Sequence, residues 1–287
     1  MSRHVTGHTG LLCLLGSPVA HSISPEMHNE ACRILDLDYE YLAFDVKPLH
    51  LETAVRGLVT LGVRGFNLTM PDKNDMALLV DELSPAAKIS GAVNTVVNDN
   101  GRLTGHTTDG IGWMRSALDA GVDPVGKKMV QLGAGGAGTA ILVQAAIDGV
   151  KEIDVFNAHD GFWPRVENIV AQLNAETKCT VRLHDLKDMD DLKTCLQQAD
   201  ILLNTTPVGM SRIPGCLIPD PSYFHEGLVV ADVIYEPKET ELLKMAREAG
   251  LKTFNGMYML LYQGAASFEL WTGKKMPTEE IKAKFFS

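Results

Sequence analysis

The chain has 287 residues, 45% of them hydrophobic and 22% charged, which is typical of a globular protein with one large domain or two medium ones. Its net charge of -10 argues against a nucleic-acid partner, because neutralising phosphates requires clustered Lys and Arg. The apolar run Leu11–Leu15 is too short to span a bilayer, so we expect no membrane partner either.

The cysteines and histidines show no metal-binding pattern. The five cysteines lie far apart in the sequence, without the close pairs of zinc or redox motifs, which predicts reduced thiols in a cytoplasmic protein. His21 and His28 are not at helical ligand spacing, and no H-E-x-x-H segment occurs. The sequence therefore predicts no metal cofactor.

The first third of the chain mixes strands and helices. Ser24–Pro25 predicts a helix start, since proline favours the first helical position. The region Asp81–Ser90 is expected to be helical or turn-like, and a turn is expected at Asn98–Gly101. Apolar runs predict four strands here: Leu11–Leu15, Tyr39–Val46, Gly65–Met70 and Ala92–Val97.

From about residue 109, strands and helices alternate regularly, which predicts a parallel sheet with helices on both faces. The apolar stretch Gly256–Trp271 is expected to be helical. We therefore predict an α/β protein of two domains: an N-terminal α/β substrate-binding domain completed by the C-terminal helices (residues 1–109 and 255–287), and a Rossmann-type, doubly wound nucleotide-binding domain (residues 110–254). Expected strands of the second domain are Lys128–Leu132, Glu152–Phe156, Thr180–Leu183, Ile201–Leu203 and Leu228–Val233.

A glycine-rich turn follows the first of these strands. Gly133, Gly135 and Gly138 match G-x-G-x-x-G, in which the glycines permit a tight turn, the approach of a pyrophosphate and close helix packing. The positive end of the next helix would face the phosphates. A merely structural turn is the alternative. Expected cofactor contacts here are Gly133, Ala134, Gly135, Gly136, Ala137 and Gly138.

The tip of the second strand of this domain bears on the choice between NAD and NADP. It contains Asn157 and Asp160, and the next arginine is Arg165. A carboxylate accepts hydrogen bonds from ribose hydroxyls and repels a 2′-phosphate, which favours NAD, with NADP as the alternative. Asp160 is also placed to cap the following helix, which would explain it without a cofactor.

Three clusters of polar residues lie at strand or helix ends in the first domain. Each has an ordinary structural explanation when taken alone: Ser24 as a helix cap, Lys73 as a solvated surface charge and Asp109 as a helix cap. The clusters are Ser22–Ser24, Asn67–Lys73 and Thr108–Gly112, the last beside Asn94–Thr95.

Together these segments resemble the shikimate dehydrogenase family, over essentially the whole chain. The matching motifs are S-x-S-P at Ser22–Pro25, N-x-T-x-P-x-K at Asn67–Lys73, G-A-x-N-T at Gly91–Thr95, T-D-G-x-G at Thr108–Gly112, N-x-T-P-x-G-M at Asn204–Met210, Asp232–Pro237, Gly256–Met257 and Gln263–Ala265. Thr107 stands where the family commonly has Asn, and Ala158–His159 stands where NADP-using members carry arginine. An aspartate at this tip resembles the quinate/shikimate branch, which uses NAD.

The resemblance implies roles for individual residues. Lys73 and Asp109 would be the catalytic pair. The substrate's carboxylate and hydroxyls would be held by Ser22, Ser24, Asn67, Thr69, Asn94, Tyr235 and Gln263. Further cofactor contacts would be Asn157, Asp160, Thr205, Thr206, Pro207, Val208, Met210 and Gly256.

The implied function is NAD-dependent oxidation of shikimate or quinate, small-molecule substrates, by a monomer or homodimer. Lys73 would act either as the base or as a cation that stabilises an alkoxide. A relative restricted to quinate or to an amino-substituted analogue is an alternative, with Tyr41 and Thr107 as candidates for reading quinate's extra hydroxyl. A non-catalytic regulatory module of the same fold, and a two-domain dehydrogenase acting on folates, are more distant alternatives.

Overall fold

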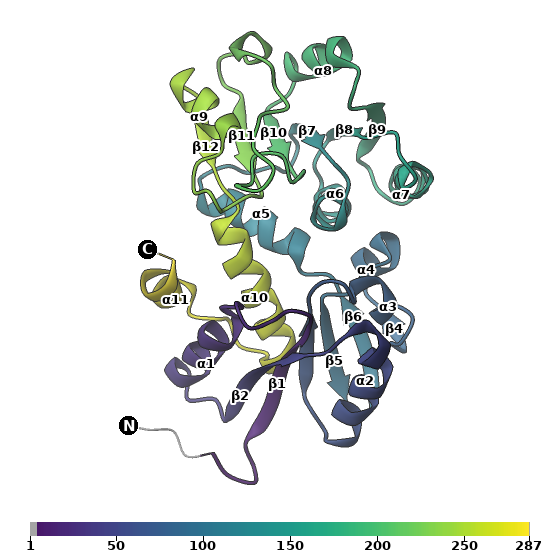
Figure 1. Cartoon of the computed structure of the whole chain (residues 1–287), viewed down its shortest axis with the longest axis vertical. Coiled ribbons are helices and arrows are strands. Elements are labelled where there is room, and N and C mark those ends of the chain that lie inside the picture. Colours follow the sequence, from purple (N-terminus) through teal and green to yellow (C-terminus); the bar gives the residue numbers. More distant parts are fainter. Residues whose placement is uncertain (1–4, 287) are drawn as a thin grey trace. The chain divides into compact units, whose positions relative to one another are not determined.

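The computed structural model describes residues 5–286. The described residues up to Thr108 and those from Leu261 onward form one compact unit, and Asp109–Leu260 form a second. Among the described residues, no helix combines the length and the apolar character needed to cross a membrane. Each unit has an α/β fold, as predicted, with one six-stranded sheet (Figure 1).

The sheet of the first unit has the strand order β2-β1-β3-β5-β6-β4. Strand β1 pairs in parallel with β2 and β3, whereas β5 runs antiparallel to both β3 and β6. The elements are β1 (Gly10–Gly16), α1 (Ser24–Ile34), β2 (Tyr39–Asp45), η1 (Pro48–His50), α2 (Leu51–Thr60), β3 (Gly65–Leu68), α3 (Lys73–Met76), β4 (Glu82–Leu83), α4 (Pro85–Ser90), β5 (Thr95–Asp99), β6 (Arg102–His106) and α11 (Thr278–Phe285).

Two expectations for this unit were incomplete. The predicted strand Ala92–Val97 begins only at Thr95, and β6 follows it as an unpredicted partner. Asn100 and Gly101, both with positive φ, make the two-residue loop of a hairpin between the two strands. The short strand β4 also lies in the region expected to be helical or turn-like, where only α4 is a helix.

The sheet of the second unit is entirely parallel, with the order β12-β11-β10-β7-β8-β9. This is the doubly wound arrangement, in which the strand order reverses between β7 and β10. The elements are α5 (Asp109–Asp119), β7 (Lys128–Leu132), α6 (Gly136–Asp148), β8 (Glu152–Asn157), α7 (Trp163–Glu176), β9 (Thr180–Asp185), α8 (Met189–Leu196), β10 (Ile201–Asn204), η2 (Pro221–Tyr223), β11 (Val229–Asp232), α9 (Glu241–Glu248), β12 (Lys252–Phe254) and α10 (Met257–Thr272), which continues into the first unit.

Separate apolar cores support the two sheets. In the second unit, Leu132, Phe156 and Leu202 pack with apolar residues of α8 and α9. In the first unit, Phe66 and Val96 belong to the cluster that includes residues of α2. These buried cores hold the strands in place, and therefore also fix the first residues of the loops that follow the strands. Most of the predicted site residues lie on those loops.

Candidate functional site

The glycine turn connects β7 to α6. Gly133 has a φ of +90°, a left-handed conformation that favours glycine, and its N–H donates to the carbonyl oxygen of Phe156 at 2.7 Å. A Cβ atom on Gly135 or on Gly136 would meet no atom of residues 5–286 within 4 Å. The backbone at the start of α6 is therefore open beside the positive end of the helix, an arrangement that suits a pyrophosphate.

Two side chains hold the closed side of this turn. Gln131 Nε2 donates to the carbonyl oxygens of Gly133 and Gly138, at 2.8 and 2.9 Å. Thr205 Oγ1 donates to the carbonyl oxygen of Gly133 at 2.8 Å, and a Cβ atom on Gly138 would overlap that hydroxyl. Thr205 was expected to contact the cofactor, and Gln131 was not predicted at all. Both make contacts that shape the turn.

The tip after β8 is tied to the glycine turn through Asn157. Its Oδ1 accepts a hydrogen bond of 2.9 Å from the N–H of Ala134. Asp160 Oδ1 accepts one of 2.9 Å from the N–H of Phe162, which is itself the N-cap residue of α7. Asp160 thus stabilises the turn before the helix, although it is not the cap, and one carboxylate oxygen makes that bond.

The Thr205–Met210 loop is held by a buried pair behind it. Asn204 Oδ1 accepts from the N–H and the hydroxyl of Thr206, and its Nδ2 donates to the carbonyl oxygen of Val208 at 3.1 Å. Nδ2 also lies 3.1 Å from Asp232 Oδ1. Burial raises the pKa of Asp232 to about 6, and hydrogen bonds from Ile234, Asn204 and Thr240 act in the opposite direction. Pro207 is exposed, and Met210 half-buried.

In the first unit, a buried hydrogen-bond network is centred on Asn67. Its Oδ1 accepts from the Tyr41 hydroxyl at 2.8 Å, and its Nδ2 donates to the carbonyl oxygen of Asn94 at 3.0 Å. The same nitrogen lies 3.0 Å from Thr95 Oγ1 and 3.1 Å from Ser267 Oγ. Because both ends of its amide are bonded inside the protein, Asn67 joins β3, β2, β5 and α10.

Asn94 and Gln263 belong to the same network. Asn94 Oδ1 accepts from the backbone N–H of Thr108 at 2.8 Å, and its Nδ2 lies 3.5 Å from Gln263 Oε1. Ser267 Oγ donates to the carbonyl oxygen of Gln263 at 3.0 Å and lies 2.8 Å from Thr95 Oγ1. Ser267 was missed in the sequence, because it is 172 residues from Thr95 and belongs to no recognised motif.

The serine pair lies at the start of α1, as predicted. Ser22 Oγ accepts from the N–H of Ser24 at 3.2 Å. Ser24 is buried, whereas Ser22 and Thr69 are half-buried. The Tyr41 side chain is fully buried, so in this conformation its hydroxyl is out of reach of a ligand arriving from solvent. Thr107 is also buried.

Lys73 begins α3 and is half-buried, and its carbonyl oxygen accepts from the N–H of Val93 at 2.8 Å. The preceding residue, Asp72, is fully buried, and its two carboxyl oxygens accept no hydrogen bond from the described residues. Burial raises the pKa of Asp72, and the neighbouring Asp75 adds to the rise. Asp72 is thus a buried carboxyl group next to the predicted catalytic lysine, and the sequence did not indicate it.

Asp109 is the first residue of α5, in the second unit, and it is half-buried. A Cβ atom on Gly110 would overlap the carbonyl oxygen of Ala140, so α5 packs closely on α6. The glycine that follows Asp109 is therefore required by helix packing. This close contact fixes the backbone from which the Asp109 side chain projects.

Two further predicted residues also lie in the second unit. Tyr235, expected at the substrate, is 48% exposed after β11. Gly256, expected at the cofactor, presses against the backbone of Val233, where a Cβ atom would overlap the carbonyl oxygen. That contact alone is a sufficient reason for glycine at position 256.

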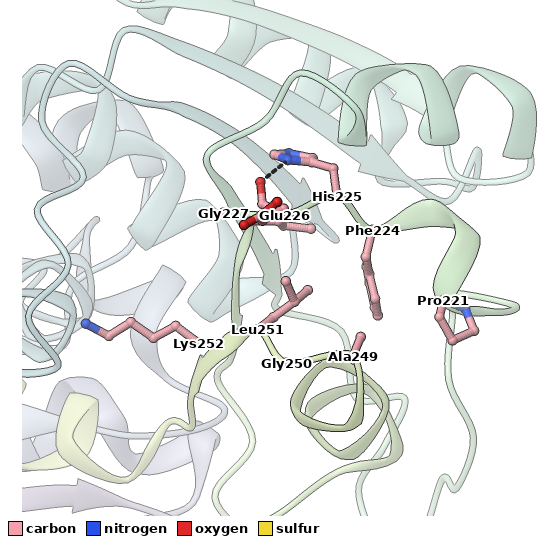
Figure 2. Close-up of a pocket in the computed structure, with 10 residues that line it drawn as sticks. Pro221, Phe224, His225, Glu226, Gly227, Ala249, Gly250, Leu251 and Lys252 are labelled. Atoms are coloured by element: carbon pink, nitrogen blue, oxygen red, sulfur yellow. Dashed lines mark hydrogen bonds between the residues drawn. The ribbon is translucent and has the colours of Figure 1, made fainter.

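A hollow of about 430 Å³ lies elsewhere in the second unit, between η2 and the loop before β12. Figure 2 shows His225 turned back on its own loop, with Nδ1 2.8 Å from the carbonyl oxygen of Glu226. Lys252 Nζ donates to the carbonyl oxygen of Gly121 at 3.0 Å. None of the predicted site residues lines this hollow, and the side chains of His225 and Lys252 are already engaged.

The chain is similar to known proteins over its full length. Residues 14–96 match the model of the shikimate dehydrogenase substrate-binding domain, and residues 256–284 match that of the shikimate 5′-dehydrogenase C-terminal domain. A protein of Listeria monocytogenes serotype 4b, named shikimate dehydrogenase (NADP(+)), is 47% identical over 287 residues, covering 100% of this chain and 99% of its own.

Two solved structures are similar in fold. The crystal structure of shikimate 5-dehydrogenase from Listeria monocytogenes, in complex with shikimate and NAD, has a TM-score of 0.95 and 47% identity, and covers 99% of this chain and 98% of its own. Quinate dehydrogenase from Corynebacterium glutamicum, in complex with NAD, has a TM-score of 0.85 and 31% identity, and covers 97% of this chain and 99% of its own.

Proposed function

Because the chain belongs to the shikimate dehydrogenase family, we propose that it catalyses the reversible NAD-dependent oxidation of shikimate, quinate or both, to 3-dehydroshikimate or 3-dehydroquinate. The observation that carries the proposal is the glycine turn. The space beside Gly135 and Gly136 is empty of described atoms, whereas Thr205 and Thr206 fill the space beside Gly133, and Thr205 fills that beside Gly138. Such a turn at the carboxyl end of β7 suits a dinucleotide.

A nicotinamide dinucleotide whose pyrophosphate is held at this turn would supply the hydride acceptor, and the chain's own residues would handle the substrate and the proton. We assign the proton to Lys73 and Asp109. Lys73 either takes it from the substrate hydroxyl as a base or stabilises the alkoxide as a cation. Both residues are half-buried, which supports this assignment. The backbone of Lys73 is held by the hydrogen bond from Val93, and that of Asp109 by the close packing at Gly110.

The substrate's carboxylate and hydroxyls are assigned to the polar residues of the first unit, with Tyr235 from the second. The buried network divides them into two kinds. Ser22, Thr69 and Gln263 are partly exposed and suited to direct contact. Asn67 and Asn94 are buried and hold the others in place through the bonds to Tyr41, Thr108 and Ser267. On this assignment, the substrate contacts other than Tyr235 belong to residues 1–109 with 255–287, and the NAD contacts other than Gly256 belong to residues 110–254.

The proposed preference for NAD rests on the tip after β8. Asp160 carries a carboxylate, and no arginine lies between Asn157 and Pro164. A 2′-phosphate at this tip would meet a negative charge, whereas two ribose hydroxyls would meet an acceptor. The Listeria relative is named for NADP(+), while the Listeria structure contains NAD, so both cofactors belong in the test.

The test measures the ratio of NADH formed to ketone product formed. The purified chain given shikimate and NAD should form one NADH for each 3-dehydroshikimate, because the alcohol carbon gives its hydride to the nicotinamide and the hydroxyl gives up one proton. Failure to reduce either cofactor with shikimate or quinate would contradict the proposal. A cytoplasmic location stays a prediction of the sequence.

A further inference from the structure

A second cluster of reactive side chains lies at the outer edge of the nucleotide-domain sheet. Asp154 on β8, His184 on β9 and Cys195 on α8 each present one ligand atom, and these atoms lie within 4.8 Å of one another. His184 Nε2 is 3.0 Å from Asp154 Oδ1. All three residues are half-buried, and none belongs to the glycine turn, the Thr205–Met210 loop or the substrate network.

The fold fixes these positions. Strands β8 and β9 pair in parallel with Phe156 opposite His184, and the two rings stack with centroids 4.6 Å apart. The stacking holds the imidazole against the edge of the sheet. Cys195 comes from α8, four residues after Asp191, so the two side chains share one face of the helix.

Asp191 supplies the second contact that a metal-binding histidine normally has. Its Oδ2 lies 2.5 Å from His184 Nδ1, on the side of the ring opposite Asp154. A carboxylate at one ring nitrogen fixes the tautomer and makes the other nitrogen a better ligand. Asp191 is therefore placed to act as the carboxylate of a carboxylate–histidine–metal triad, with a metal bound at Nε2 beside Asp154.

We propose that Asp154 Oδ1, His184 Nε2 and Cys195 Sγ form a binding site for Zn²⁺, with a water molecule as fourth ligand. Mixed sulfur, nitrogen and oxygen ligands favour zinc, whereas Mg²⁺ and Ca²⁺ prefer oxygen alone. Around a tetrahedral zinc, ligand atoms lie about 3.3 to 3.8 Å apart. The His184–Asp154 pair at 3.0 Å would open slightly, and a pair near the 4.8 Å bound would close by about 1 Å.

The charges at the cluster balance on binding. Arg182 Nη1 lies 3.3 Å from Asp154 Oδ1 and 3.4 Å from Glu152 Oε2, so it can keep Glu152 as its partner while zinc takes Asp154. Zinc binds the thiolate of Cys195 and the neutral ring nitrogen of His184, so its binding would release the thiol proton and any proton on Nε2.

The sequence predicted no metal site, because its cysteines form no closely spaced pairs and it contains no H-E-x-x-H segment. His184 is 30 residues from Asp154, and the third ligand lies on another element. Only the parallel pairing of β8 with β9, and the return of α8 over that edge, bring the three together. A bound zinc would join α8 to the two strands and stabilise the second unit.

The test uses the full-length chain and needs no enzyme assay. Calorimetric titration should show one Zn²⁺ bound per chain, with no binding of Mg²⁺. Titration with Co²⁺ should give a sulfur-to-cobalt charge-transfer band, which requires a thiolate ligand. Cys195→Ala should abolish the band, and His184→Gln should weaken zinc binding by about a hundredfold. Asp191→Asn should weaken it by about tenfold.

Cys216→Ala is the matched control, because Cys216 is also half-buried in the second unit but is outside the cluster. It should leave both the zinc affinity and the cobalt band unchanged. Absence of zinc binding by the unmodified chain would overturn the proposal. Zinc binding that survives in both Cys195→Ala and His184→Gln, with circular dichroism showing that the variants are folded, would also overturn it.

Discussion

Thr205 Oγ1 donates a hydrogen bond of 2.8 Å to the carbonyl oxygen of Gly133. This bond joins the loop after β10 to the loop after β7, at the point where the strand order of the sheet reverses. The Thr205 hydroxyl leaves no space for a side chain at Gly138, whereas a Cβ atom on Gly135 would meet no atom of the described residues within 4 Å. Glycine is therefore required at different positions of the motif for different physical reasons. Substitutions at Gly135 and Gly138 can distinguish these reasons.

Gly135→Ala should leave the stability of the protein nearly unchanged, because the new methyl group meets no protein atom and the φ of −70° suits alanine. It should raise the Kd for NAD by about tenfold or more, since the methyl group occupies the approach of the pyrophosphate. Gly138→Ala should instead lower the melting temperature, because its Cβ atom overlaps Thr205 and lies 2.8 Å from the Gly133 carbonyl oxygen. Thermal unfolding and NAD titration of both variants check the pair; equal effects on stability would contradict this account.

Asp160→Asn should shift cofactor preference toward NADP. The amide keeps the oxygen that accepts from the N–H of Phe162, so the turn before α7 should survive, while the charge that repels a 2′-phosphate is lost. We expect kcat/KM for NADP to rise about tenfold relative to NAD, a free-energy change of about 1.4 kcal/mol. Asp160→Ala, which loses the bond as well, is the comparison. An unchanged ratio in Asp160→Asn would mean that the carboxylate serves only the turn.

Lys73→Ala should lower kcat by about a hundredfold or more, the usual effect of losing a group that handles the proton. Melting temperature and NAD affinity should be retained. Lys88→Ala, at an exposed lysine of α4 in the same unit, is the control and should keep normal turnover. Near-normal turnover of Lys73→Ala across the pH range would remove Lys73 from the mechanism.

His28 should make the protein less stable in acid. It is fully buried on α1, stacks on Tyr41 with ring centroids 4.4 Å apart, and has no hydrogen-bond partner for either ring nitrogen among the described residues. Burial lowers its pKa from 6.5 to about 3. Between these values the unfolded chain holds a proton that the folded chain does not, so stability present above pH 6.5 is lost as the pH falls.

The loss attributable to His28 should approach about 1.4 kcal/mol per pH unit within that window. His28→Leu should remove this part of the pH dependence of the unfolding free energy, measured by denaturant titration. His50→Leu, at an exposed histidine, should keep it. If both variants follow the original pH dependence, the folded pKa of His28 is not lowered.

The parts of the fold that the sequence predicted correctly are those with a local signal. The apolar strand before Gly133 and the small residues of α6 after it are neighbours in sequence, so the turn could be recognised. The hairpin between β5 and β6 was only half predicted. Asn100–Gly101 is a strong hairpin signal, but β6 reads Arg-Leu-Thr-Gly-His, with too few apolar residues to identify a strand.

Contacts between distant segments could not be predicted. Gln131 appeared to be one residue of a buried strand, and only the structure shows its amide bonded to Gly133 and Gly138. Ser267 appeared to be one position of an apolar helix, yet its hydroxyl meets Thr95. Motif comparison indicated Asn67 as a substrate ligand. It could not show that Tyr41 and Ser267 already bond both ends of its amide.

The most direct test of the central claim is a comparison of kcat/KM for shikimate and quinate, each with NAD and with NADP. The account predicts that at least one of the two acids is oxidised, with a higher kcat/KM when NAD is the cofactor. Reduced nicotinamide should appear in step with the ketone product. No oxidation in any of the four combinations would contradict the proposed activity, and a higher kcat/KM with NADP would contradict the role given to Asp160.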